Sequence, residues 1–162
     1  MPRVTNPLKL ALQGSFRPLG YEFCKGDWIR RCEEVVQLVN LQCEPGDQYF
    51  LNASCWICKL GLPASLKERY GHYRFRINWR VDPRFDELLN VFANQDSIRD
   101  EERETRCREL LQEKAIPLLD RLTSVELLRN AYLAKLVRNV AIVREASLYL
   151  FGCAPPPRLS DC

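Results

Sequence analysis

The sequence predicts an α+β fold with an N-terminal helix, a four-stranded antiparallel meander and C-terminal helices packed on the sheet. Three observations support this prediction. Apolar residues recur at helical spacing over residues 8–19, alternate with polar residues over much of 21–81, and return to helical spacing after residue 82. Short connections between consecutive strands favour antiparallel pairing. With 162 residues the chain has the length of one domain, so we expect residues 1–152 to form a single α+β domain and residues 153–162 a flexible Pro-rich tail.

The first predicted helix begins at Pro7. Asn6 precedes it as a good N-cap, and Pro7 suits the first helical position, where its missing N–H costs nothing. Pro18 disfavours helical geometry in the residue before it. The helix should therefore end there, and Gly20 should turn the chain.

Four strands are predicted where apolar and polar residues alternate, at residues 28–32, 35–43, 49–58 and 73–81. The Glu-Pro-Gly-Asp sequence between the second and third strands is a turn signal. The fourth strand alternates without exception. That pattern is typical of a strand with one face in the core and the other face free.

Helices are predicted again after residue 82. Thr123 and Glu126 have the spacing of a capping box, with Thr123 as the N-cap of the last helix, and Gly152 should end that helix. The expected helical segments cover residues 86–92, about 98–114, 117–122 and 124–151.

Cys55 and Cys58 form the only C-x-x-C motif in the chain. Both cysteines fall inside a predicted strand, and an offset of three places them on opposite faces of a sheet. A zinc site would also need a second cysteine pair, and the chain has a single histidine. The two thiols are therefore expected to be structural rather than redox-active or metal-binding.

The sequence also indicates no enzyme. His72, the one histidine, is expected to lie in a loop and to bond to the backbone. The chain contains neither a G-x-S-x-G elbow nor a glycine-rich phosphate loop. We therefore expect no catalytic residue, no cofactor and no metal.

The candidate site is the polar face of the fourth predicted strand. Arg74, Arg76, Asn78 and Arg80 should all point the same way from that strand, and Trp56 should lie on the matching face of the third strand. A surface that combines arginines with aromatic rings can bind an acidic protein surface, or it can stack bases and neutralise phosphates. The alternative is that these arginines form ion pairs within the fold.

Charge and composition limit the classes of partner that we expect. The chain has 24 Lys and Arg against 21 Asp and Glu, a net charge of +3 that does not require a nucleic acid. No apolar run is long enough to span a membrane, and the first residues do not resemble a signal peptide. We expect a cytoplasmic protein with reduced cysteines and no membrane partner.

Several segments of the chain resemble a bacterial family of domains of unknown function, DUF4304. The resemblance lies in the segments FRPLGY (16–21), VVQLVNLQ (35–42), FLN (50–52) and AIPLLDRL (115–122). It implies an α+β domain and no established catalytic residues.

Small bacterial α+β proteins of this kind include immunity proteins, which neutralise a toxin by binding to it. We therefore expect a non-enzymatic binding protein, of the immunity type, that occludes the active site of a toxin domain. The alternative is a single-stranded nucleic-acid-binding domain that uses the same sheet face. Its affinity would fall steeply with salt.

Overall fold

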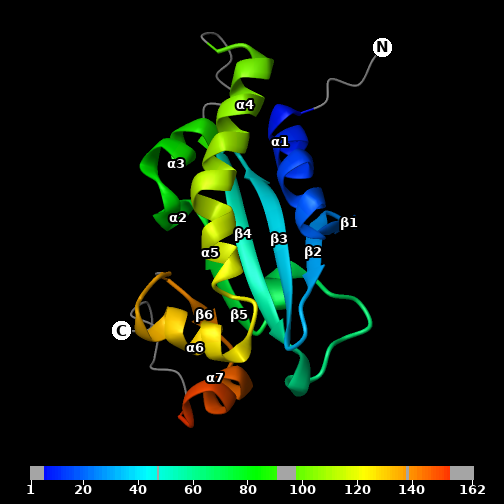
Figure 1. Cartoon of the computed structure of the whole chain (residues 1–162), viewed down its shortest axis with the longest axis vertical. Helices are drawn as coiled ribbons and strands as arrows, with labels where there is room; N and C mark the ends of the chain where they lie inside the picture. Colours follow the sequence, from blue (N-terminus) through cyan, green and yellow to red (C-terminus); the bar gives the residue numbers. More distant parts are fainter. Residues whose placement is uncertain (1–5, 47, 91–97, 138, 154–162) are drawn as a thin grey trace.

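The computed structural model describes residues 6–46, 48–90, 98–137 and 139–153, without the side chain of Arg80. Within these residues, six strands form one antiparallel sheet in chain order (Figure 1). The strands are β1 (Glu22–Cys24), β2 (Asp27–Arg31), β3 (Val35–Glu44), β4 (Gln48–Ile57), β5 (Tyr73–Arg76) and β6 (Ala141–Ile142). The α+β class and the antiparallel sheet are confirmed, whereas the prediction of four strands is wrong.

The two strands that the sequence prediction missed lie at the edges of the sheet. β1 has three residues and β6 has two, too few for an alternating pattern to be recognised. The central hairpin of β3 and β4 follows the prediction. It pairs from Val35 opposite Ile57 to Glu44 opposite Gln48, and Gly46 adopts the positive φ of the predicted turn.

The fourth predicted strand ends five residues early. β5 stops at Arg76, and Asn78–Val81 form a short helix, α2. The reason is the side-chain amide of Asn78, whose Oδ1 accepts from the N–H of Leu51 at 3.2 Å and whose Nδ2 donates to the carbonyl of Tyr49 at 3.4 Å. Because this amide satisfies β4 as a strand backbone would, the chain can leave the sheet without unpaired polar groups.

The helix at the N-terminus is as predicted. α1 (Pro7–Phe16) has Asn6 as its N-cap, and the Asn6 Oδ1 accepts from the backbone N–H groups of Leu8 and Lys9. A short 3₁₀ turn (Arg17–Leu19) follows α1, and Gly20 after this turn adopts a left-handed backbone conformation.

The predicted helices at 98–114 and 117–122 form one continuous rod. α4 (Asp100–Leu110) passes through a π-helical segment (Leu111–Ala115) into α5 (Ile116–Asp120). Pro117 has no N–H and its ring would meet the carbonyl four residues earlier, so a locally widened helix accommodates it. A short helix, α3 (Pro83–Asn90), precedes the rod.

The single long helix predicted at 124–151 is wrong. The chain instead forms α6 (Val125–Leu133), β6, and α7 (Arg144–Phe151). Lys135 and Asn139 have positive φ angles between the two helices, which breaks the helical path. The N-cap of α6 is Ser124 and not Thr123, because the Ser124 hydroxyl accepts from the N–H of Leu127.

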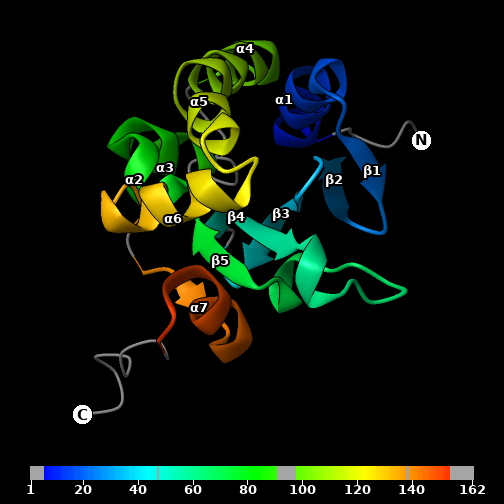
Figure 2. The ribbon, with the colours of Figure 1, turned by 60° about the horizontal axis from the view of Figure 1, so that its bottom comes forward.

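The helices α1, α4 and α5 cover one face of the sheet, and the segment 58–72 lies against the other (Figure 2). The side chains under the helices form the main core, which includes from the sheet Trp28, Val39, Leu51, Ala53, Cys55, Tyr73 and Phe75. A separate small apolar cluster on the opposite face contains Val36, Leu38 and Trp56. No helix in the described part of the chain has the length and apolarity needed to span a membrane. Beyond Cys153, the predicted tail lies outside the described residues.

Candidate functional site

Arg74 and Arg76 project from β5 on the face of the sheet away from the main core. Their neighbours Tyr73 and Phe75 are buried in the core, so the arginines point to the opposite side. In the β4–β5 register, Ser54 lies opposite Arg74, and Asn52 lies opposite Arg76. This is the shared polar face that the sequence predicts.

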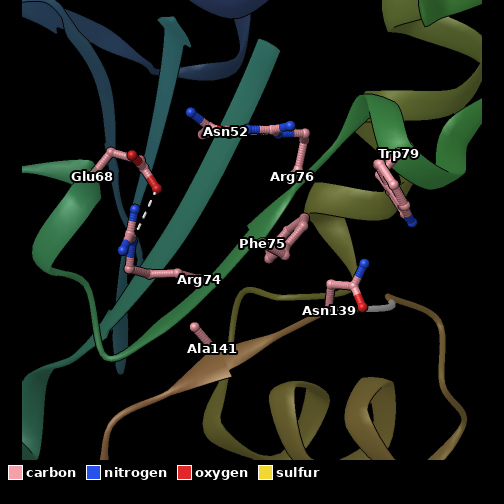
Figure 3. A pocket seen from close by; sticks show the side chains of 8 residues that line it. All are labelled: Asn52, Glu68, Arg74, Phe75, Arg76, Trp79, Asn139 and Ala141. Atoms are coloured by element: carbon pink, nitrogen blue, oxygen red, sulfur yellow. Dashed lines mark hydrogen bonds and ion pairs between the residues drawn. The ribbon is translucent and has the colours of Figure 1, made fainter. Parts of the chain in front are cut away.

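This face contains two adjoining hollows that share Glu68 and Arg74. We call them together the sheet groove. The first hollow, of about 280 Å³, is lined by Asn52, Glu68, Arg74, Phe75, Arg76, Trp79, Asn139 and Ala141 (Figure 3). The second, of about 500 Å³, adds Lys25, Asp27, Asn40, Gln42, Lys67 and Arg69. Strand residues therefore form the floor of the groove, and the β1–β2 turn, the 3₁₀ turn Glu68–Tyr70 and α2 contribute to its walls.

Arg76 is held in place by its neighbours on β4. Its guanidinium carbon lies 3.5 Å from the centroid of the Phe50 ring, and its Nε donates to the Oδ1 of Asn52 at 3.4 Å. The amide of Asn52 donates in turn to Gln42 at 2.7 Å. The stacked position and this chain of hydrogen bonds fix the plane of the guanidinium. Figure 3 shows the side chains of Arg76 and Asn52 extending toward each other.

Glu68 is the buried carboxyl at the centre of the groove. It is 5% exposed, and its Oε1 accepts from the Nε of Arg74 at 3.3 Å. Burial raises the pKa of Glu68 above its ordinary value, and the positive charge of Arg74 offsets part of that rise. Gly71 makes this approach possible, since a Cβ there would lie 2.4 Å from the Cβ of Ser54 on the sheet.

Asp27 is the second buried carboxylate of the groove, at 3% exposed. Its Oδ2 lies 3.3 Å from the Nζ of Lys67, and its Oδ1 accepts from the amide of Asn40 at 3.0 Å. Lys67 also donates to the carbonyl of Lys25 at 2.7 Å, which ties the segment after β4 to the β1–β2 turn. Both acidic groups of the groove therefore have a cation within the fold.

Asn78, Arg80 and Trp56 depart from the prediction in different ways. Asn78 is buried in its contacts with β4, and Arg80 belongs to α2 rather than to a strand. Trp56 is on the predicted face but only 8% exposed, because the segment 58–72 covers it and its ring packs 4.7 Å from that of His72. The prediction that Arg74, Arg76, Asn78 and Arg80 lie along one strand is therefore wrong, because β5 ends at Arg76. Arg74 and Arg76 keep the predicted strand positions.

Trp79 is the residue that the sequence analysis missed. Strict alternation placed it in the core, but the turn into α2 leaves it 57% exposed at the end of the groove. Figure 3 shows its ring beyond Arg76 on the α2 side of the hollow. The signal that could have identified it is Asn78, a residue with a strong tendency to end regular structure by bonding to nearby backbone.

The two cysteines of the C-x-x-C motif and His72 are part of the fold around the end of β4. Cys55 is buried on the core face, where burial raises the pKa of its thiol. Cys58 begins a 3₁₀ turn instead of continuing the strand. The Nδ1 of His72 accepts from the backbone N–H of Ile57 at 2.9 Å, as predicted for a loop histidine. Among the described residues, no group of three or more His, Cys, Asp or Glu side chains could hold a metal ion.

Comparison with known proteins places this architecture in a family. Residues 12–121 match the family described as Domain of unknown function (DUF4304). Since the match covers more than half of the chain, the protein belongs to this family, and the resemblance seen in the sequence is confirmed. A search of curated proteins and a search of solved structures each gave no match. The matched region contains most of the sheet groove, whereas α6, β6 and α7 lie outside it.

Proposed function

We propose that this member of the DUF4304 family is a non-enzymatic binding protein that recognises a protein partner through the sheet groove and Trp79. The observation that supports the proposal best is the combination of an exposed tryptophan with Arg74 and Arg76 along one groove. Tryptophan and arginine are enriched among the residues that dominate binding energy at protein interfaces. Most tryptophans are largely buried in a fold, so a ring that is 57% exposed beside two arginines favours an interface.

The groove is organised before any partner binds. Arg76 is stacked on Phe50, and Arg74 is bonded to Glu68, so neither side chain needs to be ordered on association. Pre-ordered side chains lower the entropic cost of binding. This supports recognition of a partner by a largely rigid surface, as in an inhibitor that covers an active site.

The proposed partner is a toxin domain in the cytoplasm, which makes this chain an immunity-type protein. The seven cysteines within the described residues are free, which supports a reducing compartment. The small net positive charge argues against a nuclease target, because an inhibitor that mimics nucleic acid should be acidic.

Co-expression with a toxin domain tests the proposal, and the candidate toxin is to be sought among the genes adjacent to this chain's gene. The wild-type chain should restore growth, and a double variant, Arg76→Glu with Trp79→Ala, should not, although it remains folded by circular dichroism. The matched control is Arg106→Glu, since Arg106 is an exposed arginine on α4, away from the groove. Rescue by the double variant as complete as that by wild type would contradict the proposed surface.

The second candidate function is binding of single-stranded nucleic acid. The stack of Arg76 on Phe50 and the exposed ring of Trp79 favour it, because bases stack on such groups. The buried carboxylates of Asp27 and Glu68 in the same groove oppose it. Affinity for oligothymidylate that falls steeply with salt would support this candidate over a protein partner.

A further inference from the structure

We propose that the occupant of the sheet groove is an acidic segment of the partner, with carboxylates that bind Arg74 and Arg76 and an apolar side chain that packs on Trp79. This inference rests on the proposed function and adds the chemistry of the partner. The charge of the groove, the free edges of its arginines and their spacing support it.

The groove carries a surplus of positive charge. Its described lining residues include five cations and two carboxylates, which leaves a surplus of three. Asp86 on α3 also lies within electrostatic range of Arg76, and counting it still leaves a surplus of two. The cations are Lys25, Lys67, Arg69, Arg74 and Arg76. The chain as a whole is nearly balanced at +3, so the positive charge is concentrated here.

Arg74 and Arg76 each use only part of the guanidinium within the fold. Arg74 donates through its Nε to Glu68, and Arg76 donates through its Nε to Asn52. Among the described residues, neither arginine has a hydrogen bond from its two Nη atoms. Those two nitrogens form one edge of the planar fork that binds a carboxylate in a bidentate way.

The spacing of the two arginines fits an extended acidic segment. They lie two residues apart on β5, so their side chains leave the strand about 6.6–7 Å apart. Acidic residues at alternate positions of an extended partner segment have the same repeat. Trp79 lies beyond Arg76, where an apolar side chain of the same segment can reach it.

The buried carboxylates select a segment with separated charges over a continuous polyanion. Glu68 and Asp27 line the groove together with its cations, so the closely spaced charges of a phosphate backbone would include some next to these carboxylates. A peptide can place neutral residues at those points and acidic residues at the arginines. Like charges in direct apposition oppose binding, so the arrangement discriminates between the two.

A peptide titration tests the inference. The probe is a capped peptide of alternating glutamate and alanine, and its matched control replaces glutamate by glutamine. Tryptophan fluorescence reports binding at the groove, because Trp28 and Trp56 are buried and Trp79 is exposed. We expect the glutamate peptide to bind and Arg76→Gln to weaken it about tenfold, corresponding to ~1.4 kcal/mol. Arg106→Gln should leave the affinity unchanged.

Equal binding of the glutamate and glutamine peptides would overturn the inference, as would an unchanged affinity in Arg76→Gln. Tighter binding of oligothymidylate than of the glutamate peptide would also overturn it, in favour of nucleic acid. Growth rescue by the wild-type chain without any binding of the acidic peptide would reject the acidic occupant and keep the proposed function. Peptide binding without growth rescue would reject the toxin assignment and keep the acidic occupant.

Discussion

The two faces of the sheet are built from the same strands and differ in nearly every other property. On β4, Leu51 points into the core under the helices, and Asn52, the next residue, points into the groove. Apolar burial holds the helix-covered face, whereas around the groove pairs of polar groups order one another, next to a small apolar cluster at Val36, Leu38 and Trp56. Most of the buried apolar side chains of the sheet lie on the helix-covered face, so polar side chains on the other face are available for recognition.

Truncation of neighbouring residues on β4 is the strongest way to test this difference. Leu51→Ala removes a fully buried side chain from the core and should lower the unfolding free energy by about 2–5 kcal/mol. Asn52→Ala removes hydrogen bonds to Gln42 and Arg76 and should cost about 1 kcal/mol. Denaturant unfolding measures both values. Equal losses would contradict the division of roles between the faces.

Asn78 lies where β5 has ended and α2 begins, and its side-chain amide bonds to the backbone of β4. Asn78→Ala leaves the N–H of Leu51 without its partner in a buried position, which should cost about 1–3 kcal/mol. Amide hydrogen exchange should show lost protection at Leu51. The exposed position of Trp79 on α2 also depends on this contact, so the fluorescence of Trp79 should change in the variant. Protection at Leu51 equal to wild type would show that the amide does not hold β4.

The pH dependence of stability gives a smaller effect with a defined sign. Burial raises the pKa of Glu68 above its ordinary value of 4.5, so the folded state holds this proton more tightly than the unfolded chain. The unfolding free energy should therefore fall as the pH rises from about 4.5 through the raised pKa. Glu68→Gln should flatten this part of the profile. A profile identical to wild type over that range would contradict the buried position of the carboxyl.

His72 should produce the smallest effect and one of opposite sign. Burial lowers its pKa below the ordinary 6.5, so the folded state holds the proton more weakly than the unfolded chain. Stability should be lost as the pH falls below 6.5 through the lowered pKa. His72→Gln keeps an acceptor for the N–H of Ile57 and should remove this loss. If the melting temperature falls with decreasing pH equally in wild type and in His72→Gln, His72 does not contribute to the pH dependence of stability.

Patterns that are local in sequence predicted much of this fold. The N-cap at Asn6, the turn after β3 and the polar face shared by β4 and β5 follow from capping, turn chemistry and alternation. The edge strands β1 and β6 could not be predicted in the same way, because two or three residues gain their pairing from strands far along the chain.

The sequence predicted only part of the candidate site, because local patterns place some of its residues and tertiary contacts place the others. Arg74 and Arg76 lie where alternation places them. Trp56 is covered by a segment without periodicity, and Trp79 becomes exposed through a tertiary contact of Asn78. Glu68 and Lys67 reach the groove from that same connecting segment. Their position depends on the close approach of Gly71 to Ser54, which no local pattern encodes.

Measuring both stability and affinity on Arg76→Gln separates a role of this arginine in the fold from a role in binding. Arg76→Gln removes the guanidinium and its stacking on Phe50 but leaves the main core unchanged. Its unfolding free energy should therefore stay within about 1 kcal/mol of wild type. Its affinity for the alternating glutamate peptide should fall about tenfold. A variant that unfolds several kcal/mol more easily yet binds the peptide as wild type does would show that Arg76 serves the fold and not a partner.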